Sequence, residues 1–241
     1  MIILNMKKHD IIFIILLILI FIPFILSSNI FNAYLTFNHN HSLMTSFIKF
    51  AILATIGEII GLRIKTGVYT KPGFGILPRM LVWGFIGVTI KIAMVIFATG
   101  TPYLLEYLGL NGAIKSMGGD FNLEKLLVSF SIRVFLNVIY APVMMTFHRI
   151  TDMHINNTGG TIRGFFTPFG FNNLLLNLDW DVQWNFVFKK TIPLFWIPAH
   201  TITFLLPPDF RILFAAILGI ALGTILAIAD IMGDSKSIMK K

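Results

Sequence analysis

Residues 80–99 read MLVWGFIGVTIKIAMVIFAT, a run of twenty positions in which Lys91 is the one charged side chain. An α-helix of about 20 mostly apolar residues is long enough to cross the hydrocarbon core of a bilayer. Further apolar segments on either side of this run occupy residues 11–26, 46–62, 126–147, 191–206 and 212–232. The sequence therefore predicts an all-α fold, a polytopic helical membrane bundle of about six spans.

The overall composition agrees with a membrane domain. Of the 241 residues, 56% are hydrophobic and 12% are charged, whereas soluble domains carry about 25% charged residues. We expect an N-terminal signal-anchor span with an outer loop at residues 1–45, followed by a helical, channel-like membrane domain at residues 46–241. A cleaved signal peptide is the alternative for residues 11–26, but the apolar run is long and no clear cleavage site follows it.

The basic residues are distributed unevenly between the predicted loops. With the N-terminus inside, thirteen Lys or Arg side chains fall on inner segments, whereas the outer segments hold Lys115, Lys125 and Arg211. Because cytoplasmic loops carry the excess of Lys and Arg, we predict a multi-pass protein of the cell membrane with both termini cytoplasmic. The excess of basic residues behind the net charge of +8 lies in these short loops. Nucleic-acid binding instead requires basic residues that cluster on one folded face. The expected partner is the lipid bilayer, with no nucleic acid.

Polar side chains inside the predicted spans are the strongest functional signal, because a charge at a helix centre costs about 2.5–3.5 kcal/mol. These side chains recur in steps of three and four, so they share helix faces. We predict that the following residues face a pore or a solute: Glu58, Lys91, Arg133, Asn137, His200 and Thr203. Two basic residues against one acid suit a small polar or anionic solute. The alternative is that Glu58 pairs with Lys91 or Arg133 and only holds the bundle together.

Small residues recur at the same helical spacing. Such ribbons let helix backbones approach closely in lipid. The predicted packing positions are Gly57, Gly61, Gly84, Gly87, Ala215, Gly219, Gly223 and Ala227.

Other chemistry has weaker signals. His148, Asp152 and His154 are residue types that bind metals, but their spacing lacks a closely spaced His pair and favours a polar turn at the headgroup level. We find no nucleotide-binding loop and no set of residues at catalytic spacing. We therefore expect a protein that is not an enzyme and that has no cofactor and no metal.

Four motifs occur in the order found in a known family. They are Gly57-Glu58, Arg79 with the Gly-rich segment 84–87, Asn137 with Tyr140-Ala141-Pro142, and Trp196, His200, Thr203-Phe204, Pro208 and Arg211. This order resembles the peroxisomal and mitochondrial membrane channel family, that of the twenty-two-kilodalton peroxisomal membrane protein. The sequence departs from the family pattern by Glu58 in place of Asp and by Val88 and apolar residues in place of Pro and His. The resemblance implies a compact bundle that acts as a weakly selective channel for small solutes.

Our leading hypothesis is a channel or pore for small polar or anionic solutes. One alternative is the substrate-binding membrane subunit of a vitamin-type transporter, which also has six spans and few charges. Another is a structural or assembly protein whose membrane charges only pair with each other. A homo-oligomer is compatible with all three.

Overall fold

The computed structural model describes residues 7–118, 120, 122–205, 214, 218 and 221, and this part of the chain is helical without any strand. Its elements in chain order are α1 (Lys8–Leu26), α2 (Ser28–Asn40), α3 (Ser42–Thr66), α4 (Ile76–Tyr107), α5 (Ala113–Ser116), α6 (Leu123–Phe135), a π-helix η1 (Leu136–Tyr140), α7 (Ala141–Asn157), α8 (Ile162–Phe165), α9 (Phe171–Leu176), α10 (Trp180–Val182), a π-helix η2 (Gln183–Trp196) and α11 (Ile197–Leu205). The prediction of an all-α fold is confirmed for these residues.

Four helical segments are long and apolar enough to cross a membrane. They are α1, α3, α4 and the continuous helix Leu123–Asn157, which joins α6, η1 and α7. The predicted spans at residues 11–26, 46–62, 80–99 and 126–147 lie within these four segments. The chain is therefore compatible with a multi-pass membrane protein.

The fifth and sixth predicted spans are not among these four. Residues 191–206 belong to a helical stretch that runs from Trp180 through η2 to Leu205. Pro193 lies inside η2, where it removes a backbone donor from the helix. The predicted span at residues 212–232 lies outside the described residues, apart from three isolated positions.

Two segments predicted as loops are helical. Residues 28–40, in the predicted outer loop, form α2, and the Ser27 hydroxyl caps this helix by accepting a hydrogen bond from the backbone N–H of Ile30 (3.3 Å). The fourth predicted span ends at residue 147, but its helix continues to Asn157. This extension is stable because its polar side chains find partners on α3 and α4, as described below.

The helices α3 and α4 pack against each other through two glycines of α4. A Cβ added to Gly87 would lie 2.6 Å from the backbone oxygen of Ser46, and one added to Gly84 would lie 2.5 Å from the ring of Phe47. A side chain at Gly87 would press on the backbone of α3, whereas one at Gly84 would have to displace the Phe47 ring, so Gly87 above all allows the close approach of α3 and α4. Gly57 and Gly61 of α3 are buried as well.

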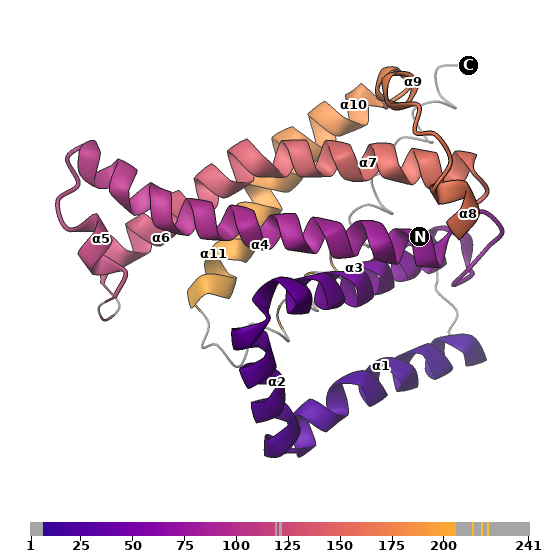
Figure 1. Ribbon diagram of the computed structural model, residues 1–241, viewed down its shortest axis with the longest axis horizontal. Coiled ribbons are helices and arrows are strands. Elements are labelled where there is room, and N and C mark those ends of the chain that lie inside the picture. The colour runs from indigo at the N-terminus through magenta and orange to yellow at the C-terminus, as the bar shows by residue number, and fades with distance from the viewer. Residues whose placement is uncertain are drawn as a thin grey trace.

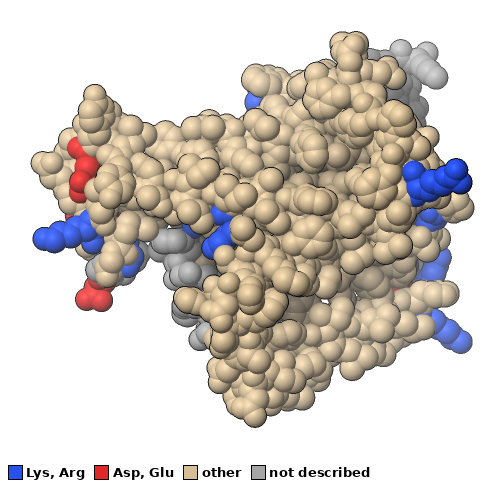
Figure 2. All heavy atoms as spheres, in the orientation of Figure 1, with Lys and Arg blue, Asp and Glu red and all other residues tan. Residues whose placement is uncertain are grey.

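The long helices α3, α4 and α7 run side by side, whereas most of α1 lies further from them in this view, and α1 is connected to α3 through α2 (Figure 1). The charged side chains on the face in Figure 2 gather mainly at the two ends of the molecule, and its middle is nearly free of charge. This pattern is typical of a protein whose middle lies in hydrocarbon and whose ends lie in water.

The start of α1 is held to the end of α3 by an ion pair. Arg63 donates two hydrogen bonds of 2.7 Å to the carboxylate of Asp10, and the Tyr69 hydroxyl donates a third of 2.7 Å. The ring of Tyr69 also stacks on Phe13, with 4.5 Å between the ring centroids. Burial of the Tyr69 hydroxyl and its bond to Asp10 raise the pKa of this phenol.

Candidate functional site

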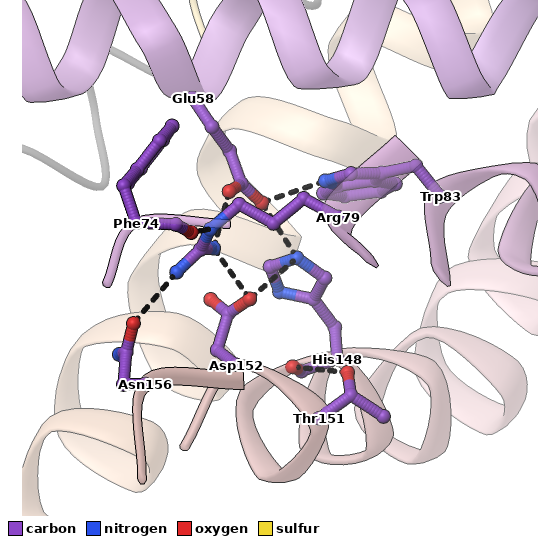
Figure 3. A network of polar contacts seen from close by, with 8 residues as sticks. All are labelled: Glu58, Phe74, Arg79, Trp83, His148, Thr151, Asp152 and Asn156. Carbon is purple, nitrogen blue, oxygen red and sulfur yellow. Dashed lines mark hydrogen bonds and ion pairs between the residues drawn. The ribbon is translucent and has the colours of Figure 1, made fainter. Parts of the chain in front are cut away.

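Five polar side chains from three spans meet at one place, near the ends of α3 and α7 and the beginning of α4 (Figure 3). Glu58 comes from α3, Arg79 and Trp83 from α4, and His148 and Asp152 from α7. We call these five residues the inner network, because the predicted topology places them on the cytoplasmic side.

Glu58 is the centre of the inner network. One oxygen, Oε1, accepts a hydrogen bond from Trp83 Nε1 (2.6 Å) and also lies 2.8 Å from His148 Nε2. The other oxygen, Oε2, accepts a hydrogen bond from Arg79 Nη1. Both oxygens are therefore occupied, and the indole of Trp83 also packs on the imidazole of His148 with 4.3 Å between ring centroids.

Arg79 connects α4 to α7 and to the preceding loop. Its Nη1 donates to Asp152 Oδ1 (2.6 Å), its Nη2 to Asn156 Oδ1 (3.3 Å), and its Nε to the backbone oxygen of Phe74 (2.7 Å). The side chain is only 7% exposed. A guanidinium presents its donors in a fixed fork, so these bonds fix the relative position of three segments.

The charges of the inner network nearly balance. Two carboxylates face one guanidinium, and His148 Nε2 lies 3.7 Å from Asp152 Oδ1 and close to Glu58. Two carboxylates and one guanidinium together carry one negative charge. One additional proton, held by His148 or by a carboxylate, would make the inner network neutral. A buried charge is stable only when it is paired and hydrogen-bonded, and here each charged group has such a partner.

Local helix geometry explains how the sequence builds this site. Arg79 and Trp83 are four residues apart, and His148, Asp152 and Asn156 follow the same spacing, so each set lies on one helix face. Hydropathy alone misses this relation, because it treats Arg79 as a loop charge and His148 and Asp152 as a polar turn. The shared spacing on two helices, facing Glu58 on a third, is the signal that identifies the site.

Glu58, His148 and Asp152 are residue types that bind metals, and their ligand atoms lie within 4.8 Å of one another. Arg79 Nη1, however, bonds to both carboxylates. The positive charge that a metal would supply is thus already provided by the protein, and a dication would be repelled by this guanidinium. His154, the third of the potential metal-binding residues considered from the sequence, instead contacts the backbone oxygen of Phe165 at 3.0 Å.

A second polar group lies deeper in the bundle, around the π-helix η1. Asn137 Nδ2 donates to the backbone oxygen of Arg133 (2.9 Å) and lies 3.1 Å from His200 Nδ1 on α11. Both Arg133 and Asn137 are buried. The structure thus brings together Arg133, Asn137 and His200, while the hydroxyl of Thr203 bonds to the backbone oxygen of Ala199 in its own helix (2.7 Å).

Glu58 is not paired with Lys91 or Arg133, the two partners that the sequence suggests. On α4, Lys91 lies well after Arg79, and Arg133 lies well before His148 on the helix Leu123–Asn157, whereas Arg79 on the first turn of α4 faces Glu58 directly. Lys91 is half-buried in the middle of α4, and its charge repels that of Lys49 on α3. The predicted packing residues Ala215, Gly219, Gly223 and Ala227 lie outside the described residues.

No family model, no curated protein and no solved structure matches this chain. The resemblance to the peroxisomal and mitochondrial membrane channel family therefore stays a prediction from the sequence motifs.

Proposed function

We propose that this protein is a multi-pass membrane protein that acts as a channel or pore for small polar or anionic solutes. The observation that carries the proposal is the convergence of ionisable and hydrogen-bonding side chains from three spans. Such residues are rare in membrane helices and, where they occur, face the bundle interior and mark solute or ion pathways. The proposed role needs no catalytic step and no cofactor.

The proposed orientation places both termini in the cytoplasm and the protein in the cell membrane. It is supported by the excess of Lys and Arg on the inner segments. In Figure 2, the end where α1 begins and α7 ends carries only basic side chains, whereas the opposite end, near α5, carries both signs.

In this account, the inner network closes the inner end of the pathway, and Lys49, Lys91, Asn137 and His200 line the rest of it. The bonds of Glu58 tie α3, α4 and α7 together. Loss of these bonds would free three helices at once, which supports a role of the inner network as a gate. The positive side chains along the pathway would favour anions over cations.

The proposal is tested by solute efflux from vesicles that contain the purified full-length chain. We expect acetate and glycerol to leave these vesicles faster than protein-free vesicles. Replacing both lysines, in the double variant Lys49→Gln/Lys91→Gln, should slow acetate efflux several-fold and leave glycerol efflux unchanged. Lys115→Gln, which changes an exposed lysine of the outer segment, is the control. Efflux at the protein-free rate for both solutes would reject the proposal.

A second function, that of a structural or assembly protein, is favoured by one observation. Both oxygens of Glu58 are occupied, and the charges of the inner network nearly balance within the protein. A network of this kind can serve only to lock three helices in place. This alternative predicts a stably folded membrane protein without solute efflux and without a bound ligand.

A further inference from the structure

Two half-buried lysines, Lys49 of α3 and Lys91 in the middle of α4, differ from two of the buried arginines. Arg63 and Arg79 each form an ion pair with a carboxylate. Within the part of the chain that the structure describes, Lys49 and Lys91 form no ion pair. Lys49 lies seven residues from the start of α3 at Ser42, which is about 10 Å along the helix axis.

Lys49 and Lys91 carry charges of the same sign, and the field of Lys91 acts against the charge on Lys49. Lys49 Nζ has one hydrogen bond, to Asn38 Oδ1 of α2 (3.3 Å). An amide oxygen is a neutral acceptor and compensates no charge. Two ammonium groups at the edge of a low-dielectric region repel each other strongly, and a bound anion would remove this repulsion.

A buried hydroxyl of α2 lies at the same place. Lys49 Nζ lies 5.9 Å from the centroid of the Tyr34 ring. The hydroxyl oxygen of Tyr34 is buried and has no hydrogen-bond partner among the described residues. An unpaired buried O–H costs free energy that a ligand oxygen would recover.

Two donors without a charged acceptor, the Lys49 ammonium and the Tyr34 hydroxyl, thus lie where α2 meets α3, and the charge of Lys91 acts on them from α4. The amide of Asn38 fixes the Lys49 side chain next to Tyr34. Figure 2 shows a small basic patch where α4 passes the junction of α2 and α3, on a middle region that is otherwise nearly uncharged. A basic group there is accessible from outside the protein.

We propose that Lys49, Lys91 and Tyr34 bind an anionic oxygen group, a phosphate or a carboxylate, between α2, α3 and α4. Each lysine donates a charge-assisted hydrogen bond to the anion, and the Tyr34 hydroxyl donates a third. The inference rests on the proposed function in one respect, since the site would be the outer anion-selective position of the pathway. The same chemistry would also hold the phosphate of an anionic lipid headgroup.

The test measures binding, so that it does not depend on transport. The full-length protein in nanodiscs of pure phosphatidylcholine is titrated with inorganic phosphate by isothermal calorimetry. We expect saturable binding, weakened about tenfold by Lys49→Gln or Lys91→Gln and less by Tyr34→Phe. Lys49→Arg should keep most of the affinity because it keeps the charge. Lys115→Gln is the control and should bind like the unmodified protein.

A second arm distinguishes the source of the anion. Nanodiscs are made from an equal mixture of phosphatidylcholine and phosphatidylglycerol, and the lipid retained by the protein is measured by native mass spectrometry. If the headgroup is the ligand, phosphatidylglycerol is retained by the unmodified protein, is lost from Lys49→Gln and Lys91→Gln, and competes with phosphate. If a free anion is the ligand, the phosphate affinity is the same in both lipids.

The proposal is overturned if neither phosphate binding nor phosphatidylglycerol retention depends on Lys49 and Lys91 in variants that elute as folded protein. Efflux without such binding would reject this site and leave the proposed pore intact. Binding without efflux would reject the pore and leave the site intact.

Discussion

The inner network and the lysines Lys49 and Lys91, which lie on its outer side in the proposed topology and which we call the outer pair, place charge in opposite ways. At the inner network, Glu58 and Asp152 share Arg79, and each charged side chain has a partner from another helix. At the outer pair, Lys49 and Lys91 carry the same sign and have between them one neutral acceptor, Asn38. The first arrangement is complete without a ligand, and the second is not.

In the proposed function, this difference separates a region that holds the fold from a region that would bind a solute. A saturated ion-pair network resists change, because removing one member leaves the others buried and unpaired. An uncompensated pair of cations lowers the stability of the anion-free protein. Binding of an anion would restore that stability. Substitutions at the two regions should therefore change stability in opposite directions.

The largest effect is expected at Arg79. The variant Arg79→Met leaves Glu58 and Asp152 facing each other without a cation and should cost about 3–5 kcal/mol in the free energy of unfolding. Thermal unfolding of the detergent-solubilised protein measures this loss. Arg163→Met, which changes an exposed arginine, is the control and should have little effect.

The double variant Glu58→Gln/Arg79→Met sharpens this prediction. With one carboxylate neutralised, much of the penalty should disappear, so the two substitutions should be far from additive. Additive losses would show that Glu58 and Arg79 do not form the pair described here.

The next largest effect tests the helix contact that positions both regions. Gly87→Ala places a methyl group 2.6 Å from the backbone oxygen of Ser46 and should cost about 2–3 kcal/mol, as overpacking does. Gly100→Ala on the same helix meets nothing within 4 Å. It should be neutral or stabilise the protein by up to about 1 kcal/mol, because alanine is the better helix former. Equal unfolding temperatures for the two variants would argue against the close contact of α3 and α4.

A smaller effect is expected when one donor is removed from the inner network. Trp83→Phe keeps the ring but removes the hydrogen bond from Nε1 to Glu58 Oε1 (2.6 Å). Since His148 still contacts the same oxygen, the loss should be about 1.5 kcal/mol, at the lower end for a bond to a charged group. Chemical unfolding of the solubilised protein checks it. A loss as large as that of Arg79→Met would mean that the ring packing, and not the bond, matters.

The smallest effect should have the opposite sign. Lys91→Gln removes one of two repelling charges and is expected to raise the stability of the anion-free protein by up to about 1 kcal/mol. The same variant should no longer gain stability from added phosphate, whereas the unmodified protein should. A destabilisation by Lys91→Gln in phosphate-free buffer would show that this lysine has a partner and would remove the contrast between the two regions.

The apolar runs predict the long helices well, because crossing hydrocarbon requires length and hydrophobicity, and both are readable from residues 11–26 or 80–99. The interior polar contacts are harder to predict. Glu58 is recognisable as a buried charge, but its partner Arg79 lies at a helix start, where a basic residue is usually exposed. His148 and Asp152 lie on a helical extension whose polar composition resembles a loop. Only the three-dimensional approach of α3, α4 and α7 connects these residues.

The most direct test of the central claim is a current recording from the purified protein in a planar bilayer with a potassium chloride gradient. The account predicts discrete conductance steps whose reversal potential lies toward that of chloride, and a shift of this potential toward zero in the double variant Lys49→Gln/Lys91→Gln. A membrane that contains the folded protein and conducts no more than the bare bilayer would contradict it.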